Sequence, residues 1–155
     1  MKALRAVWAS ILWLFVILIP IQFYLAGHGA MEGAHAADKS IAVMKTAWDP
    51  HAAFGTLMLL ISLLALLLAL ACRLPRRLLG LTAALFVFMI IQFFLPFLND
   101  SASSRSIAAL HGVNALIVTG LALAVAVPAR SYLPMARAHA IAGEATPTEL
   151  GATVR

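Results

Sequence analysis

The sequence predicts an all-α, polytopic membrane protein: an up-down bundle of four transmembrane helices with an internal helix-pair repeat. Of its 155 residues, 63% are hydrophobic and only 11% are charged, a balance that is not typical of a water-soluble domain. The apolar residues gather into runs of about 20, the length that a helix needs to cross a bilayer. Similar polar residues recur at matching positions in the first and second pairs of runs. Together these observations fix the fold class.

The four apolar runs predict one transmembrane domain over residues 1–128. Its helices are expected at about 7–26, 52–72, 78–98 and 107–127. Residues 129–155 mix Ala, Pro, Thr and Gly without periodicity, so we expect a mobile cytoplasmic tail there. The first run, which follows Lys2 and Arg5, also resembles a signal peptide, but its length and its internal counterpart favour a permanent helix.

The segment between the first two runs, residues 27–50, predicts a long polar external loop, part of which is helical. Asp49 is a candidate N-cap for the second helix, and Pro50 suits a first helical turn because its missing N–H costs nothing there. His51 would then lie in the first turn of that helix. We expect it to face the outer membrane boundary.

The positive charges lie between the apolar runs, so they predict an orientation and not a nucleic-acid surface. All 11 Lys and Arg fall into a larger and a smaller group, namely Lys2, Arg5, Arg73, Arg76, Arg77, Arg130, Arg137 and Arg155 against Lys39, Lys45 and Arg105. The positive-inside rule then places both termini in the cytoplasm. The partner is the lipid bilayer of a bacterial-type inner membrane, and no nucleic acid is expected. A single cysteine, Cys72, excludes a disulfide or thiolate cluster within one chain.

The repeat shows in two glutamines and two histidines. Gln22 and Gln92 lie near the outer ends of the first and third runs, each within an Ile-Gln-Phe sequence. His51 and His111 open the second and fourth runs. Parallel repeats place corresponding residues around an axis along the membrane normal. We therefore expect the two histidines to face each other across the bundle at one depth.

Two opposing histidines in a helical bundle predict a haem b site. Imidazole is a common iron ligand, and facing helices build cofactor sites in bundle cores. Gly55 and Ala115, one turn inward, are small enough to leave room for a flat macrocycle. Gln22 and Gln92 either bond neighbouring helices or orient an imidazole or meet a propionate. The alternative for each histidine is an interfacial role, bonded to water or a loop carbonyl.

This layout resembles one four-helix half of the haem A synthase family, through Gln22, His51, Gln92 and His111. The resemblance implies that His51 and His111 are haem ligands near the outer side. Two features of that family are missing: Trp48 stands where an acidic residue precedes the first ligand, and the external cysteine pair is absent. Oxidation of a haem methyl group is therefore not implied.

The expected function is electron transfer or haem handling through bis-histidine ligation, and not turnover of an organic substrate. Compatible partners are a redox protein or a quinone, with Tyr24, Trp48 and Phe54 near the outer interface, and a homo- or hetero-oligomer. The alternative is a membrane interaction or assembly protein without a cofactor. A small multidrug exporter is disfavoured because no Asp or Glu lies within a predicted span. A weaker candidate metal site is formed by His28, Glu32, His35 and Asp38.

Overall fold

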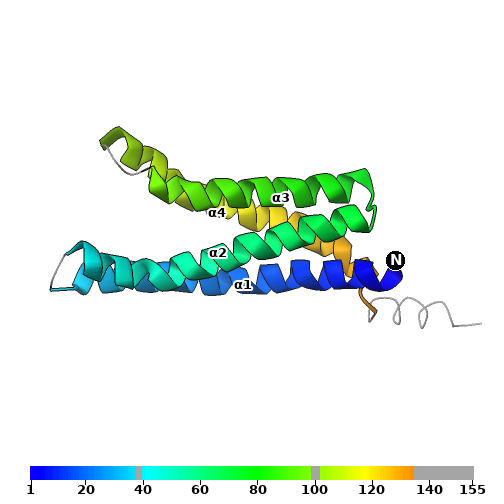
Figure 1. Ribbon diagram of the computed structural model, residues 1–155, viewed down its shortest axis with the longest axis horizontal. Helices are drawn as coiled ribbons and strands as arrows, with labels where there is room; N and C mark the ends of the chain where they lie inside the picture. Colours follow the sequence, from blue (N-terminus) through cyan, green and yellow to red (C-terminus); the bar gives the residue numbers. More distant parts are fainter. Residues whose placement is uncertain (38–39, 99–101, 135–155) are drawn as a thin grey trace, which may run out of the picture.

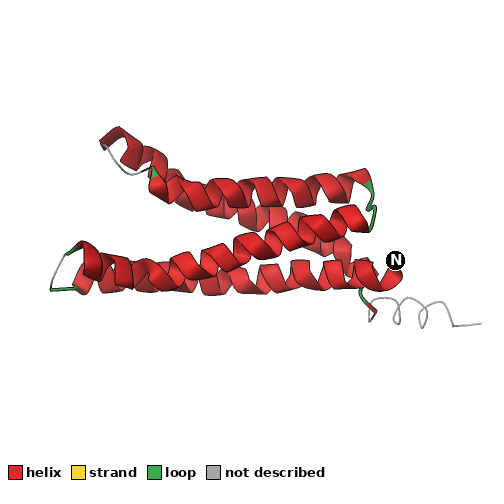
Figure 2. Cartoon of the chain, viewed as in Figure 1, coloured by secondary structure: helices red, strands yellow, loops and turns green. Residues whose placement is uncertain are grey.

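The computed structural model describes residues 1–37, 40–98 and 102–134, and these are helical with short connections (Figure 2). The elements are α1 (Lys2–His35), α2 (Ile41–Ala71), α3 (Arg76–Phe94), the 3₁₀ turn η1 (Leu95–Phe97), α4 (Ala102–Ala129) and the 3₁₀ turn η2 (Arg130–Tyr132). No strand occurs in these described ranges. The predicted all-α class is confirmed.

The helices form a ring in which each packs on its neighbours in the chain and α1 closes against α4. Helices α1 and α2 form a first hairpin, and α3 and α4 form a second. Figure 1 shows the hairpins close together at the end that carries the N-terminus and diverging towards the other end. We call these the closed end and the open end. The up-down four-helix bundle is as predicted.

All four helices are long and apolar enough to cross a membrane. The candidate spans are Lys2–His35, Ala42–Ala71, Arg76–Phe97 and Ala109–Tyr132. Large apolar side chains such as Ile17, Leu60 and Leu116 stay more than half exposed on the outside of the bundle. In water such a surface would be very costly, whereas lipid solvates it without penalty. By length and composition, this is a membrane protein.

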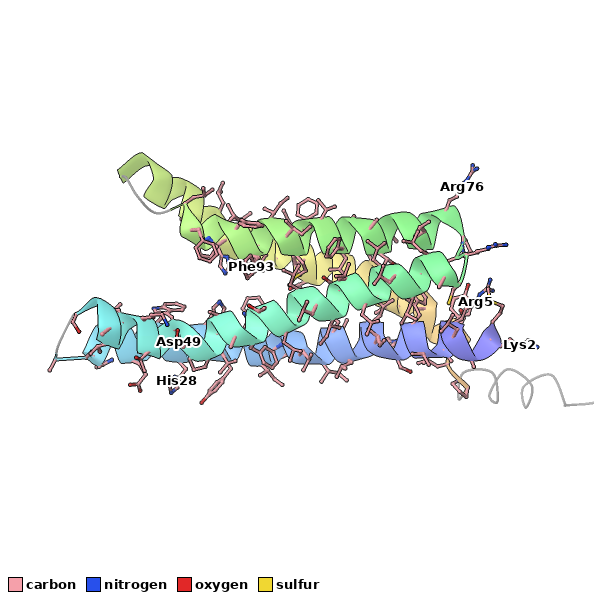
Figure 3. The ribbon with its side chains drawn as sticks, viewed as in Figure 1. Lys2, Arg5, His28, Asp49, Arg76 and Phe93 are labelled. Carbon is pink, nitrogen blue, oxygen red and sulfur yellow. The ribbon has the colours of Figure 1, made fainter. Side chains whose placement is uncertain are left out.

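The closed end is tightly packed by large residues on the odd helices and small ones on the even helices. Its buried residues include Trp8, Leu12, Phe15, Ala65, Ala69, Cys72, Leu85, Ala122, Val125, Ala126 and Ala129. Small residues on α2 and α4 let those backbones approach the bulky side chains of α1 and α3 closely. Lys2, Arg5 and Arg76 mark this end in Figure 3.

The turn after α4 is tied to the closed end. The Tyr132 ring lies edge-on to Trp8, with ring centroids 6.0 Å apart, and Arg5 lies over it at 5.8 Å from its centroid. Arg5 also donates to the carbonyl of Cys72 at 3.3 Å. The turn η2 thus packs on the bundle although it follows residue 128, where we expect the transmembrane domain to end. Residues 135–155 of the expected tail lie outside the described residues.

The first hairpin extends further than the sequence predicted, because most of the expected loop at residues 27–50 is helical. Glycines on α1 let α2 approach: a Cβ added at Gly29 would lie 2.8 Å from the Ala47 carbonyl oxygen, and one at Gly33 would lie 3.0 Å from Met44. This packing between α1 and α2 stabilises helical structure beyond the apolar runs. Helix α1 therefore runs to His35, and α2 begins at Ile41.

The predicted start of α2 at Asp49 was wrong. The N-cap is Ser40, whose hydroxyl accepts from the backbone N–H of Val43 at 3.4 Å. Asp49 lies within the helix and accepts from Lys45, one turn back, at 3.1 Å. Pro50 is also inside the helix. His51 therefore sits several turns into α2, where a preceding helical segment fixes its position.

Candidate functional site

The two histidines meet where the hairpins diverge. His51 on α2 and His111 on α4 come from diagonally opposite helices, and their ring centroids are 6.0 Å apart with an angle of 69° between the planes. Both residues are half-buried. The predicted convergence of the two imidazoles is confirmed, while their ligand role stays a prediction.

His51 is held by the glutamine on the preceding helix. Its Nδ1 lies 3.3 Å from the backbone carbonyl oxygen of Gln22, and its Nε2 lies 3.4 Å from the Gln22 side-chain amide nitrogen. The same amide nitrogen donates to the His51 carbonyl at 3.2 Å. Gln22 thus contacts both the ring and the backbone of His51.

His111 repeats this arrangement with Gln92 at shorter distances. Its Nδ1 lies 3.0 Å from the Gln92 carbonyl oxygen, and its Nε2 lies 3.0 Å from the Gln92 amide nitrogen. Two copies of one hydrogen-bond pattern, in the two hairpins, support the predicted helix-pair repeat.

These partners fix the tautomer of both rings. A carbonyl oxygen can only accept, so Nδ1 carries the hydrogen in each ring. Nε2 then keeps its lone pair and accepts from the glutamine N–H. This is the tautomer in which a histidine binds a metal through Nε2, with Nδ1–H held by a carbonyl.

Asn114 fixes the side chain of Gln92, and with it the Gln92–His111 pair. It is only 5% exposed, and its side-chain N–H₂ group donates to the Gln92 side-chain oxygen at 2.6 Å and to the Phe88 carbonyl at 2.9 Å. This contact was not predicted from the sequence. The position of Asn114 three residues after His111 was the signal, because residues three apart share a helix face.

The two imidazoles line one cavity of about 960 Å³ at the open end. The other lining residues are mostly apolar and include Ile19, Phe23, Trp48, Gly55, Met58, Met89, Phe93, Phe97, Gly112, Ala115 and Val118. Phe93 projects towards the first hairpin in Figure 3. This volume lies at the upper end of the roughly 300–1,000 Å³ common for ligand and cofactor sites.

Gln22, Gln92, Gly55 and Ala115 all line this cavity, while their role in binding a cofactor stays a prediction. One detail differs from expectation. A Cβ added at Gly55 would lie 3.1 Å from the Gln22 amide nitrogen, so the space left by this glycine receives the glutamine side chain.

The donor set and the lining of this cavity fit a bis-histidine haem. Each imidazole has its Nδ1–H bonded to a carbonyl and its Nε2 bonded to a glutamine amide, and the apolar walls suit a flat hydrophobic ring. The two rings lie close together, with their centroids 6.0 Å apart.

Most of the other candidate residues lie outside this cavity. Of the three aromatic residues considered for quinone contact, Trp48 lines it, whereas Tyr24 and Phe54 are not among the lining residues. Trp48 also meets the His51 ring edge-on at 5.7 Å.

The candidate metal site on the first hairpin is not assembled in the described residues. His28 lies 3.9 Å from Glu32 on the exposed surface of α1, and Asp38 lies outside the described residues. Within the described ranges, no group of three His, Cys, Asp or Glu residues is placed to hold a metal.

Residues 22–98 match the model of a family of unknown function, DUF6220. The matched segment begins at Gln22 and includes His51 and Gln92, but it ends before α4 and His111. No curated protein and no solved structure matches the chain. The chain is thus similar over α2, α3 and the outer part of α1 to a family that carries no assigned function.

Proposed function

We propose that this chain is an integral membrane protein that binds haem b between His51 and His111 and serves electron transfer or haem handling. The observation that supports this most is the pair of imidazoles lining one apolar cavity, each with its Nδ1–H bonded to a carbonyl. Haem b bound there would supply one-electron chemistry at its iron.

The protein's own groups would tune such a site in two ways. The carbonyls of Gln22 and Gln92 hold the Nδ1–H groups, which orients each ring and raises the basicity of Nε2. The apolar lining from Ile19, Met58 and Met89 keeps water away from the inner part of the cavity. Both effects favour stable ligation over ligand exchange.

In our proposal the open end faces the outer side of a bacterial-type inner membrane, and both termini are cytoplasmic. The excess of positive charge at the closed end supports this, since Lys2, Arg5 and Arg76 lie there. A redox protein or a quinone would then approach from the outer boundary. Trp48, which is 37% exposed and touches His51, lies on that approach.

The test is a reduced-minus-oxidised optical spectrum of the protein purified in detergent from haem-replete cells. We expect a b-type low-spin band in the wild type and its loss in the variant carrying both His51→Ala and His111→Ala. Folding of each variant is checked by circular dichroism and gel filtration, so that loss of the band is assigned to ligation.

A matched control is His28→Ala with His35→Ala, since both residues lie outside the haem cavity. This variant should keep the full band. A well-folded, colourless wild-type protein would overturn the proposal, and so would a band that survives removal of both cavity histidines. A colourless protein that copurifies with another membrane protein would favour the assembly role.

A further inference from the structure

The two imidazoles are held with different strength, although they share one hydrogen-bond pattern. Every equivalent contact is longer in the first hairpin: 3.3 Å against 3.0 Å at Nδ1, and 3.4 Å against 3.0 Å at Nε2. Bonds near 3.4 Å are at the weak end of the useful range. The His51 ring is therefore the more loosely held of the two, although Gln22 also donates to the His51 backbone carbonyl at 3.2 Å.

The glutamine side-chain oxygens show the cause. Gln92 accepts from Asn114, which is fixed by a second bond to the Phe88 carbonyl. The Gln22 oxygen is buried but has no partner among the described residues. The repeat places Phe54 where Asn114 stands, three residues after the histidine, and a phenyl ring cannot donate. Gln22 thus lacks an anchor that Gln92 has.

The glutamines also block the metal-binding nitrogens. Each amide N–H approaches Nε2 at its lone pair, which is the position that an iron atom would take. A ligand can reach Nε2 only when that amide has moved away. Displacing Gln22 breaks its bonds to His51 but no bond from a described residue to its own side-chain oxygen, whereas displacing Gln92 also breaks the bond from Asn114.

We propose that the two halves of the site open in order: Gln22 is the displaceable cap, so an incoming metal-centred cofactor binds His51 first, and the Gln92–Asn114 pair holds His111 until later. This inference rests on the proposed function for the nature of the ligand. Gln22, Gln92 and Asn114 act as positioning residues, since they control access to the imidazoles.

The order of opening can be measured without haem. Diethyl pyrocarbonate reacts with an unprotonated imidazole nitrogen, which attacks a carbonyl carbon, forms an N–C bond and releases carbon dioxide and ethanol. The ligand-free protein in detergent is labelled over time, and peptide mass spectrometry follows each histidine separately. We expect His51 to react at least three-fold faster than His111. Exposed His28 and His35 serve as internal references for reagent activity.

Three variants assign the cause of that difference. Gln22→Leu removes the cap and should speed labelling of His51 alone. Asn114→Leu frees Gln92 and should speed labelling of His111 alone, bringing it near the His51 rate. Thr119→Val, which removes only a bond from Thr119 to the Ala115 carbonyl within α4, is the matched control and should change neither rate. Equal labelling of both histidines in the wild type would overturn the proposed order.

A second arm uses haem itself. Stopped-flow mixing of ligand-free protein with haem b should show uptake slowed several-fold by His51→Ala and less by His111→Ala. The reverse ranking would overturn the order in which the histidines bind. If the wild type takes up no haem, the proposed function fails, while the labelling result still decides whether Gln22 is the looser cap.

Discussion

The two hairpins hold a histidine in the same way, but the second holds it more rigidly than the first. In both, a glutamine on the odd helix clamps a histidine on the even helix through a backbone carbonyl and a side-chain amide. The second hairpin adds Asn114, whereas the first has Phe54 at the equivalent place and leaves the Gln22 oxygen unpartnered. The two halves of the repeat therefore share the geometry of the glutamine–histidine pair. One interhelical hydrogen-bond donor, Asn114, makes the second pair the more firmly held.

The largest effect on stability is expected from removing that donor. Asn114→Leu loses two interhelical hydrogen bonds and leaves the Gln92 oxygen without its donor, so the free energy of unfolding should fall by about 2 kcal/mol. Unfolding by SDS titration in mixed micelles measures this. Thr119→Val is the control on the same helix, and its change should stay within about 0.5 kcal/mol. Equal losses in the two variants would show that Asn114 is not a special anchor.

A smaller effect is expected from filling the space beside Gln22. Gly55→Ala places a methyl group 3.1 Å from the Gln22 amide nitrogen, so the amide must shift from His51 while the helix backbone is kept. Nitrogen NMR of labelled histidine should show a changed Nε2 signal for His51 and an unchanged one for His111. Gly112→Ala, whose added Cβ meets nothing within 4 Å, should leave both signals in place.

The smallest effect on stability is expected from building the missing anchor. Phe54→Asn puts a donor where the second hairpin has Asn114, and the new bond to the Gln22 oxygen offsets the loss of apolar contact. We expect a net change of no more than about 1 kcal/mol in SDS titration. Labelling of His51 should nevertheless slow to the rate of His111. Unchanged labelling would show that the asymmetry of the site does not depend on this position.

Much of the fold followed from the sequence because bilayer crossing demands long apolar runs. The fold class, the four spans and the meeting of His51 with His111 were all predicted from run length and repeated polar residues. The helix ends were not, since they depend on contacts between helices. Gly29 packs against Ala47 and Trp48, and this contact continues α1 and α2 past the apolar runs.

The site was predicted in outline and missed in detail. Gln22 and Gln92 were singled out because they recur at equivalent positions, and orienting an imidazole was one of the roles that the sequence left open. Whether a glutamine meets Nδ1 through its backbone or Nε2 through its side chain depends on a rotation that periodicity does not encode. The difference between Phe54 and Asn114 was visible in the repeat, but its meaning required knowing that Asn114 reaches across to α3.

At the closed end, Trp8, Arg5 and Tyr132 contact one another and fill the space between the helices. Because that end is filled and the cavity lies at the far end, the cavity does not run through the bundle from one side to the other. Any guest in it exchanges with one aqueous phase and the adjoining lipid leaflet only. The same opening of the cavity would therefore serve both binding and release of a ligand.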